Sequence, residues 1–449
     1  MNSKLKTQNH ALSLVEGSKL FERREFLKRA AAGAAGLAGF PYLVRSSALG
    51  KEGNVAASER IVMGCIGVGG QGTGNMRGFL GKRDVQIVAV CDVDARQRDQ
   101  AKKIVDDRYK NNDCKTYLDF RDVIDRKDID ALSLAMPDHW HSIPVVMAAR
   151  AGKDMYGEKP LARTIYEGQV MRDAVNRYGR IWQTGSWQRS QSHFRRACEL
   201  VINGRIGKVN TVEVGLPTGG GTGNNPVQPL PEGLDWDLWL GPAPWVPYRG
   251  VVHWNWRWMM DYSGGQLTDW AGHHIDIAHW GLGLDLTGPV EIEGRGVYPK
   301  DGIYDAPTAY KFTCKYADGL TMIVANDRQQ PKGMGTVWYG EKGWIYVDRG
   351  NNLQAEPKSI LDETIGPSEI KLYQSSDHQQ NFLDCVKSRE KTITPIEVAH
   401  RSISVGLLGE IAMLTEQKLR WDPEKEIFLN SDEANRMLSR PMRSPWHLP

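Results

Sequence analysis

The sequence has no marked excess of charge of one sign. Lys and Arg total 57 against 54 for Asp and Glu, which leaves a formal net charge of +3 in 449 residues. Proteins that bind nucleic acid through its phosphates need a strongly basic surface, and this composition does not supply one. We therefore expect no nucleic-acid partner.

Cysteine is scarce and scattered. No two of the six cysteines form a C-x-x-C pair, and no histidine lies at zinc-site spacing from them, so we predict no metal centre. Isolated cysteines of this kind are usually buried thiols. The six are Cys65, Cys91, Cys114, Cys198, Cys314 and Cys385.

A long hydrophobic run of membrane-spanning length is also lacking. The apolar stretch from Ala30 to Val44 is too short to span a bilayer in the mature protein, and it follows the paired Arg23-Arg24 of RREFLKR. Ser46-Ser47-Ala48 then offers a small-residue cleavage site. An ordinary amphipathic helix is the alternative, but the apolar residues are not periodic. We expect a twin-arginine signal peptide and a periplasmic or otherwise exported protein, with no lipid anchor because no cysteine follows the stretch.

The length exceeds what one hydrophobic core usually serves. We expect a signal peptide and linker over residues 1–55, a nucleotide-binding domain over 56–185 and a second domain over 186–449.

A glycine motif follows the first predicted strand, Arg60 to Ile66. Its residues Gly67, Gly69, Gly70, Gln71 and Gly72 fit G-x-G-x-x-G, in which the backbone closely approaches a pyrophosphate at a helix N-terminus. The second predicted strand ends at Asp92, 20 residues beyond Gly72. An acid there accepts hydrogen bonds from a ribose diol and repels a 2′-phosphate, so we predict NAD rather than NADP. The alternative is a glycine-rich turn with an unrelated surface acid.

Strands and helices then alternate, which predicts a parallel sheet. Polar segments follow two of its strands, where a ligand crevice opens. They supply Pro137, Asp138 and His141 after one strand and Glu158-Lys159 before Pro160 after the next, and Thr164 with Glu167 predicts a helix cap. A lone lysine is usually a solvated cation, and only its place in the crevice favours a role for Lys159.

Four segments resemble the Gfo/Idh/MocA oxidoreductase family: GVGGQG with Asp92, PDHWH, AARAGKDMYGEKPLA and GGQLTDWAGHHIDIAHW. The resemblance implies an α/β protein with an N-terminal Rossmann domain and a C-terminal α+β domain containing a large open, mainly antiparallel sheet. It implies that Lys159 lies beside the nicotinamide and the substrate hydroxyl, and that Asp269 and His273 form the catalytic acid/base pair. Members often assemble through the open sheet face, so we expect a homo-oligomer, a dimer or tetramer.

The spacing of these residues agrees with the implied roles. On one regular helix, Asp269, His273 and Asp276 would lie on the same face, where a carboxylate can fix the tautomer of His273. Lys159 can stabilise a developing alkoxide. Asp269 and His273 could also form an ordinary contact on the surface of a helix. Metal binding by His273, His274 and Asp276 is disfavoured because adjacent helical residues diverge by about 100°.

The second half contains short strands separated by glycine-rich turns, typical of an antiparallel sheet. The aperiodic stretch between Leu216 and Gly233 is a long loop that either covers the active site or is passive. Eight tryptophans fall between Trp236 and Trp280, and we expect about two to stack on a sugar while the rest are core. The candidate substrate contacts are Trp140, Gln188, Arg189, Arg257, Tyr262 and His274.

Three hypotheses follow for the function. The first is an NAD-dependent dehydrogenase of a sugar or polyol hydroxyl. The second is a glycosidase that oxidises a sugar hydroxyl, eliminates the aglycone, adds water and reduces the sugar again. In this cycle a tightly bound cofactor is regenerated at every turnover, which suits a compartment where free NAD is scarce. The third, a scaffold that lost the chemistry, is disfavoured by the intact Lys159, Asp269 and His273.

Overall fold

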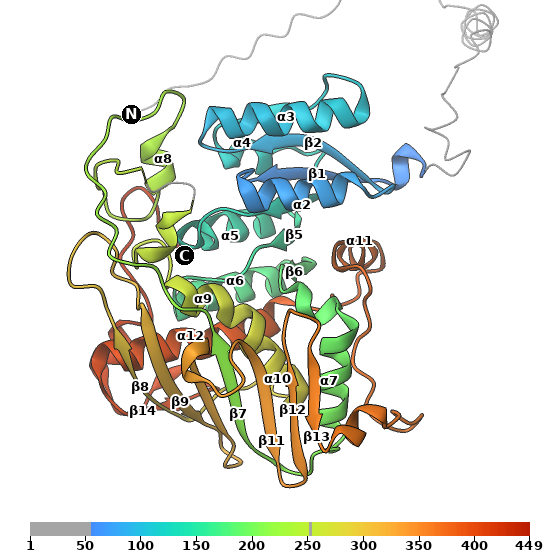
Figure 1. Cartoon of the computed structure of the whole chain (residues 1–449). Coiled ribbons are helices and arrows are strands. Elements are labelled where there is room, and N and C mark those ends of the chain that lie inside the picture. The colour runs from blue at the N-terminus through green and yellow to red at the C-terminus, as the bar shows by residue number, and fades with distance from the viewer. Residues whose placement is uncertain (1–54, 251–253) are drawn as a thin grey trace, which may run out of the picture. The chain divides into compact units, whose positions relative to one another are not determined.

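The computed structural model describes residues 55–250 and 254–449. The predicted twin-arginine segment and its cleavage site lie outside these residues. Within them the chain builds one sheet of six strands and one of nine (Figure 1). None of the helices in the described ranges has the length and apolar character needed to cross a membrane.

The six-stranded sheet has the order β3-β2-β1-β4-β5-β6, and all its pairs are parallel, as predicted. This is the Rossmann order. The strands are β1 (Ile61–Ile66), β2 (Val85–Cys91), β3 (Lys115–Tyr117), β4 (Ala131–Leu134), β5 (Asp154–Gly157) and β6 (Trp182–Thr184). The helices between them are α2 (Gly70–Leu80), α3 (Ala95–Tyr109), α4 (Phe120–Ile124), η3 (Asp138–Trp140), α5 (Ser142–Arg150) and α6 (Ile165–Arg177).

Local sequence explains where these helices begin. Asp94 and Asp119 cap α3 and α4 by accepting hydrogen bonds from the backbone N–H two residues on. Thr164 caps α6 by accepting from the N–H of Glu167, as the capping box predicts. The return bond differs, because the Glu167 carboxylate accepts from the N–H of Arg163 instead of that of Thr164.

The nine-stranded sheet has the order β13-β12-β11-β7-β10-β9-β8-β14-β15. Every pair is antiparallel except β7 with β10, so the prediction of a mainly antiparallel sheet is confirmed. Its strands are β7 (Val209–Leu216), β8 (Glu291–Val297), β9 (Ala309–Lys315), β10 (Thr321–Asn326), β11 (Gly335–Gly340), β12 (Gly343–Val347), β13 (Leu353–Glu356), β14 (Leu419–Asp422) and β15 (Ile427–Phe428).

Helices cover one face of this sheet. The long helix α12 (Ile396–Thr415) packs on β8 and β9, α10 (Asp276–Leu282) on β11, and α7 (Ser192–Ile202) on β12. Among the described residues, Figure 1 shows no helix across the opposite face. The other helical segments of this half are η4 (Trp187–Ser190), α8 (Trp236–Leu240), η5 (Asn255–Trp258), α9 (Gly265–Trp270), η6 (Ala271–Ile275), η7 (Asp327–Gln329), η8 (Lys358–Asp362) and α13 (Asp432–Arg436).

Late parts of the chain return to the Rossmann half. Helix α11 (His378–Ser388) packs Phe382 against Phe79 of α2, with ring centroids 6.1 Å apart. Trp446 packs edge-on against Trp140, at 4.7 Å. The C-terminal tail thus has a structural role beside a crevice segment.

All six cysteines are buried and unpaired, which confirms that prediction.

Candidate active site

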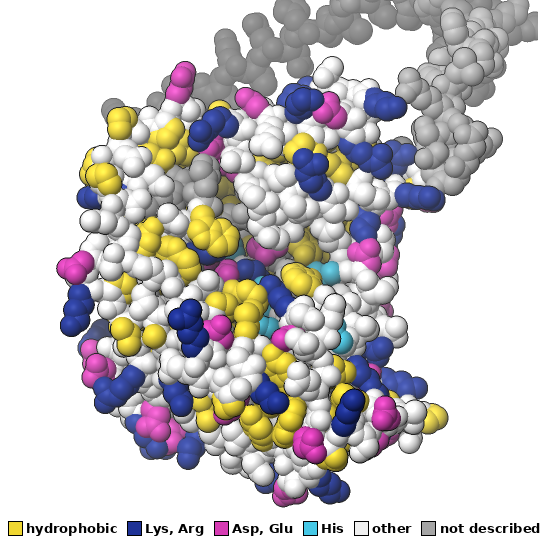
Figure 2. Space-filling model, viewed as in Figure 1, with side chains coloured by type: hydrophobic (Ala, Val, Ile, Leu, Met, Phe, Trp, Pro, Cys, Tyr) yellow, Lys and Arg dark blue, Asp and Glu magenta, His cyan; other side chains and the backbone are white. Residues whose placement is uncertain are grey.

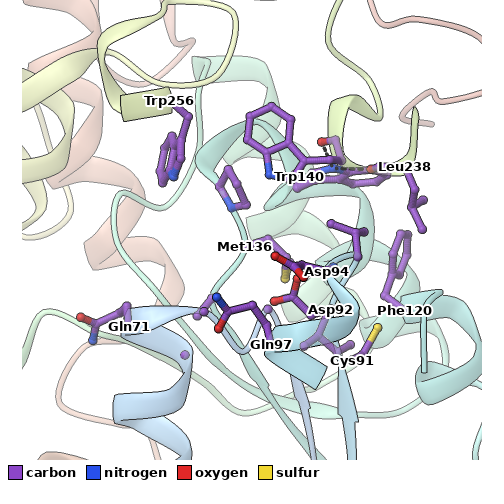
Figure 3. A pocket seen from close by; sticks show the side chains of 18 of the residues that line it. Gln71, Cys91, Asp92, Asp94, Gln97, Phe120, Met136, Trp140, Leu238 and Trp256 are labelled. Carbon is purple, nitrogen blue, oxygen red and sulfur yellow. Dashed lines mark hydrogen bonds between the residues drawn. The ribbon is translucent and has the colours of Figure 1, made fainter. Parts of the chain in front are cut away.

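A cavity of about 420 Å³ opens where β1, β2 and β4 end (Figure 3). Its floor is the glycine turn between β1 and α2, and Asp92 and Asp94 project into it from the loop after β2. This is where a Rossmann sheet binds its nucleotide.

The glycine turn has the geometry that a bound pyrophosphate requires. Gly67 has φ +76°, which favours glycine, and a Cβ on Gly72 would lie 1.7 Å from the Gly67 carbonyl oxygen. Apart from the neighbouring residues and the backbone of the helix itself, no described atom lies within 4 Å of the place where a Cβ would stand on Gly69 or Gly70, so the backbone faces open space at the start of α2. The residues therefore fit a dinucleotide with its phosphates at the helix N-terminus.

Asp92 is fixed at the edge of this cavity. Its Oδ2 accepts from the N–H of Val68 at 2.9 Å and its Oδ1 from the N–H of Asp94 at 3.0 Å. A carboxylate held there accepts hydrogen bonds from a ribose diol and repels a 2′-phosphate, which fits NAD.

A segment of the second half forms the opposite wall. The Ala95 N–H donates to the Gly233 carbonyl at 2.9 Å, and the Asp235 N–H donates to the Val93 carbonyl at 3.0 Å. Beyond these bonds the wall is lined by Leu238, Trp239, Trp254, Trp256 and Arg257, and Figure 3 shows Trp256 facing the cavity. The end of the loop that was predicted to be either a cover or passive thus lies against the nucleotide cavity.

Glu158 connects β5 to the first Rossmann helix. Its Oε1 accepts from Gln71 Nε2 at 3.1 Å and from Asn75 Nδ2 at 2.9 Å. The next residue, Lys159, donates from Nζ to Asp269 Oδ1 at 2.7 Å, and both side chains are nearly buried. The lysine that follows the carboxyl end of β5 therefore binds a carboxylate from the second half of the chain.

Asp269 and His273 do not lie on a regular α-helix as the spacing predicts. Helix α9 ends at Trp270, a π-helical turn covers Ala271–Ile275, and α10 follows. Ser186 Oγ donates to the Gly272 carbonyl at 2.6 Å, and Thr336 Oγ1 donates to the His274 carbonyl at 3.0 Å. These two hydrogen bonds hold the turn in place. Such turns are often found at functional sites.

The predicted carboxylate partner of His273 is absent from the described contacts. His273 is 2% exposed and its Nδ1 has no hydrogen-bond partner. Asp276 instead accepts from Arg189 Nε at 2.7 Å and Arg189 Nη2 at 2.8 Å. The bidentate pair competes more strongly for that carboxylate than a neutral imidazole does.

Charge and burial set the protonation states. Burial lowers the pKa of His273 well below its usual value, and the nearby cations of Arg349 and Lys159 lower it further, so the ring is neutral at physiological pH. Burial alone would raise the pKa of Asp269, but Lys159 and Arg257 outweigh it and leave that pKa lowered. The site therefore combines a neutral imidazole with an ionised carboxylate and a lysine bound to it.

The segment after β4 is divided between the cavity and the protein interior. Pro137 and Trp140 line the cavity, and Trp140 Nε1 donates to the Leu238 carbonyl at 3.1 Å (Figure 3). Asp138 accepts from Ser263 Oγ at 2.5 Å, and His141 contacts the carbonyls of Met136 and Pro160. Asp138 and His141 thus join this segment to its surroundings.

The candidate substrate contacts differ in their surroundings. Arg189 is 2% exposed and is engaged by Asp276 and Asp285, so it is held inside the fold. Tyr262 is equally buried and packs on Trp239 with ring centroids 5.0 Å apart. Arg257 does reach the centre, with Nε 3.6 Å from Asp269 Oδ1.

Gln188 and His274 lie beside this centre. Gln188 Nε2 is 3.3 Å from His274 Nδ1, and the remaining polar atoms Gln188 Oε1 and His274 Nε2 are buried without a partner.

Figure 2 shows basic, acidic and histidine side chains gathered in the hollow between the two sheets.

One neighbour of this centre could not be predicted. Arg349, in the turn after β12, stacks its guanidinium over Trp270 at 4.3 Å and Trp187 at 4.5 Å. The residue belongs to no motif, and the turn Asp348-Arg349-Gly350 looks like any hairpin connection. No signal in the sequence places it beside His273.

Family models and relatives agree with this geometry. Residues 61–186 match the NAD-binding Rossmann fold of the Gfo/Idh/MocA oxidoreductase family, and residues 218–448 match its C-terminal alpha/beta domain. The rhizopine catabolism protein MocA of Rhizobium meliloti is 22% identical over 319 residues, covering 68% of this chain and 87% of that one. A glycosyl hydrolase family 109 protein of Saccharopolyspora erythraea is 31% identical over 206 residues, covering 43% of this chain and 45% of that one.

Solved structures share the fold. The WlbA dehydrogenase from Bordetella pertussis, in complex with NADH and UDP-GlcNAcA, superposes with a TM-score of 0.61 at 16% identity, covering 81% of this chain and 98% of that one. The myo-inositol 2-dehydrogenase from Lactobacillus plantarum gives 0.57 at 18% identity, covering 80% and 99%. With an NAD-binding Rossmann domain and a matching C-terminal domain, this chain belongs to the Gfo/Idh/MocA oxidoreductase family.

Proposed function

We propose that the protein is an exported oxidoreductase that transfers hydride from a hydroxyl-bearing carbon of a sugar or polyol to a tightly held NAD. The observation that carries the proposal is the 2.7 Å bond between Lys159 and Asp269, with the buried neutral His273 one helical turn further on. Arg257 lines the nucleotide cavity and also lies 3.6 Å from Asp269, so this centre adjoins the cofactor site.

The roles of the side chains follow from their chemistry. Bound NAD supplies a hydride acceptor. Lys159 donates a hydrogen bond to the substrate oxygen and stabilises the negative charge that develops there. His273, neutral because its pKa is lowered, accepts the hydroxyl proton. Asp269 stays ionised and holds the lysine ammonium in place.

Export is part of the same proposal and rests on the paired Arg23-Arg24. The twin-arginine route carries folded proteins, so the enzyme can leave the cytoplasm with its cofactor already bound. The wall that residues 233–241 build against Val93 and Ala95 favours retention of that cofactor. Replacing both arginines by lysine should leave the protein in the cytoplasmic fraction; unchanged periplasmic recovery would contradict export by this route.

A second candidate is an NAD-recycling glycosidase. The family 109 relative, 31% identical over its matched part, favours it. In this reaction a sugar hydroxyl is oxidised, the acidified neighbouring C–H allows the aglycone to be eliminated, water adds, and the ketone is reduced again. Lys159 and His273 serve both oxidation and reduction, so the carboxylate pair of ordinary glycosidases is unnecessary.

The test compares the purified protein with its His273→Ala and Lys159→Met variants on sugars and aryl glycosides. Lys103→Met is the matched control, because Lys103 lies on α3 with a 74% exposed side chain, away from the nine-stranded sheet. We expect cofactor reduction or glycoside cleavage to disappear in the first two variants and persist in the control. Hydrolysis that survives both variants and removal of NAD would contradict the glycosidase, and an unchanged biological role in Lys159→Met would favour a scaffold.

We also propose a homo-oligomer, a dimer or tetramer, that buries the face of the nine-stranded sheet left uncovered by the described helices. Light scattering of the purified protein tests it, and a monomer at working concentration would contradict it.

A further inference from the structure

The partly buried Arg349 lacks the carboxylate partner that the buried arginines Arg163 and Arg189 have. Arg163 binds Glu410 with two nitrogens, and Arg189 binds Asp276 in the same way. Arg349 Nε and Nη2 are buried without any hydrogen-bond partner. Leaving charged donors unpaired in this way is costly. These two N–H groups, which we call the fork, are therefore suited to binding a ligand that is not part of the chain.

The fork is built to be rigid. The guanidinium packs against the rings of Trp187 and Trp270, at 4.5 Å and 4.3 Å from their centroids. Aromatic rings contact a guanidinium through its flat faces, so they leave the edge carrying the N–H groups for a polar ligand. Nε–H and Nη2–H point in parallel, which matches the two oxygens of a carboxylate.

The fork lies beside the reacting centre. Trp270 contacts both His273 and His274, with ring centroids 5.4 Å away in each case. The charge of Arg349 contributes to lowering the pKa of His273 and of His274, and it interacts with the carboxylates of Asp269 and Glu158. A group bound by Arg349 would therefore belong to the same substrate that presents its hydroxyl to Lys159.

Arg349 has no counter-ion of its own, since no carboxylate is paired with it among the described contacts. Burial lowers the pKa of Arg349 to about 10, the direction expected for a cation that has lost water without gaining a counter-ion. A carboxylate on the substrate would supply this counter-ion.

From this geometry we propose that Arg349 is a specificity residue and that the substrate is an acidic sugar, a hexuronic acid or its glycoside, whose carboxylate occupies the fork. The inference rests on the proposed function. Trp187, with 36% of its surface exposed, is the more accessible of the two rings that contact Arg349.

The test uses p-nitrophenyl hexuronides paired with the p-nitrophenyl hexosides of the same configuration, in the gluco, galacto and manno series. Binding to the NAD-loaded protein is measured by calorimetry, and cofactor reduction or p-nitrophenol release by absorbance. We expect one uronide to bind at least about 10- to 100-fold more tightly than its hexoside, the value of a bidentate charge-assisted contact.

Arg349→Met should remove that preference by weakening uronide binding alone, and Arg349→Lys should restore only part of it, because an ammonium has no fork. Lys103→Met is the control, and bound NAD should remain in all variants, which shows that the fold is intact. Absence of uronide preference in the wild type, or a preference that survives in Arg349→Met, would overturn the inference. If hexosides are turned over without such preference, the proposed oxidoreductase stands and only the acidic substrate is lost.

Discussion

Lys159→Met is the substitution whose effect can be worked out most fully from the structure. It removes the donor that lies 2.7 Å from Asp269 Oδ1, and with it the cation proposed to stabilise the developing alkoxide. Loss of one such donor costs about 3 to 4 kcal/mol in the transition state, or about 10²- to 10³-fold in kcat. Arg257 at 3.6 Å stays near Asp269, and both partners are slightly exposed, so we expect the free energy of unfolding to fall by only about 1 to 2 kcal/mol.

The assay is a single turnover of the NAD-loaded protein, followed at the absorbance of the reduced nicotinamide. A slow rate in a protein that unfolds at nearly the same urea concentration would assign the loss to chemistry. Lys159→Arg keeps a charge near Asp269 but changes its position, so it should recover stability more than rate. The reasoning would be refuted if Lys159→Met kept its rate within about threefold, since no interaction worth 3 kcal/mol could then have been removed.

Three further predictions concern other parts of the molecule. Because the pKa of His273 lies below the ordinary histidine value, kcat/KM should stay flat as pH falls through 6.5 and decline only below it; a decline centred at or above 6.5 would exclude His273 as the base. Asp92→Ala should improve the use of NADP relative to NAD by about 100-fold, measured after cofactor exchange, and an unchanged ratio would contradict the repulsion argument. Arg163→Met leaves the buried Glu410 unpaired and should lower the free energy of unfolding in urea by about 3 to 5 kcal/mol; a loss below 1 kcal/mol would show that Glu410 finds another partner.

Elements specified by local patterns could be predicted from the sequence. The apolar run before Gly67, the glycine turn and the strand ending at Asp92 appear as β1, α2 and β2 with nearly the predicted bounds. Thr164 caps its helix as expected. These features depend on residues close together in the chain, where propensity and periodicity apply directly.

Features that depend on contacts between distant residues could not be predicted. The π-turn at Ala271–Ile275 is held by Ser186 and Thr336, which lie 86 and 62 residues from their acceptors. Asp276 pairs with Arg189 rather than His273, because the fold brings a guanidinium to it. Arg349 reaches the centre from a hairpin turn, and turn sequences do not specify what their exposed side chains approach.

The central claim is that the protein holds NAD and uses it to oxidise a sugar hydroxyl. The most direct measurement is to purify the protein without added cofactor, identify the nucleotide released on denaturation by mass spectrometry, and record reduced-nicotinamide absorbance when uronic acids, neutral sugars or their aryl glycosides are added to the native protein. We predict that NAD is released from the denatured protein and that a sugar or glycoside either reduces it or is cleaved in its presence alone. A protein that turns over none of these substrates with bound or added NAD, or that cleaves glycosides after NAD has been removed, would contradict the account.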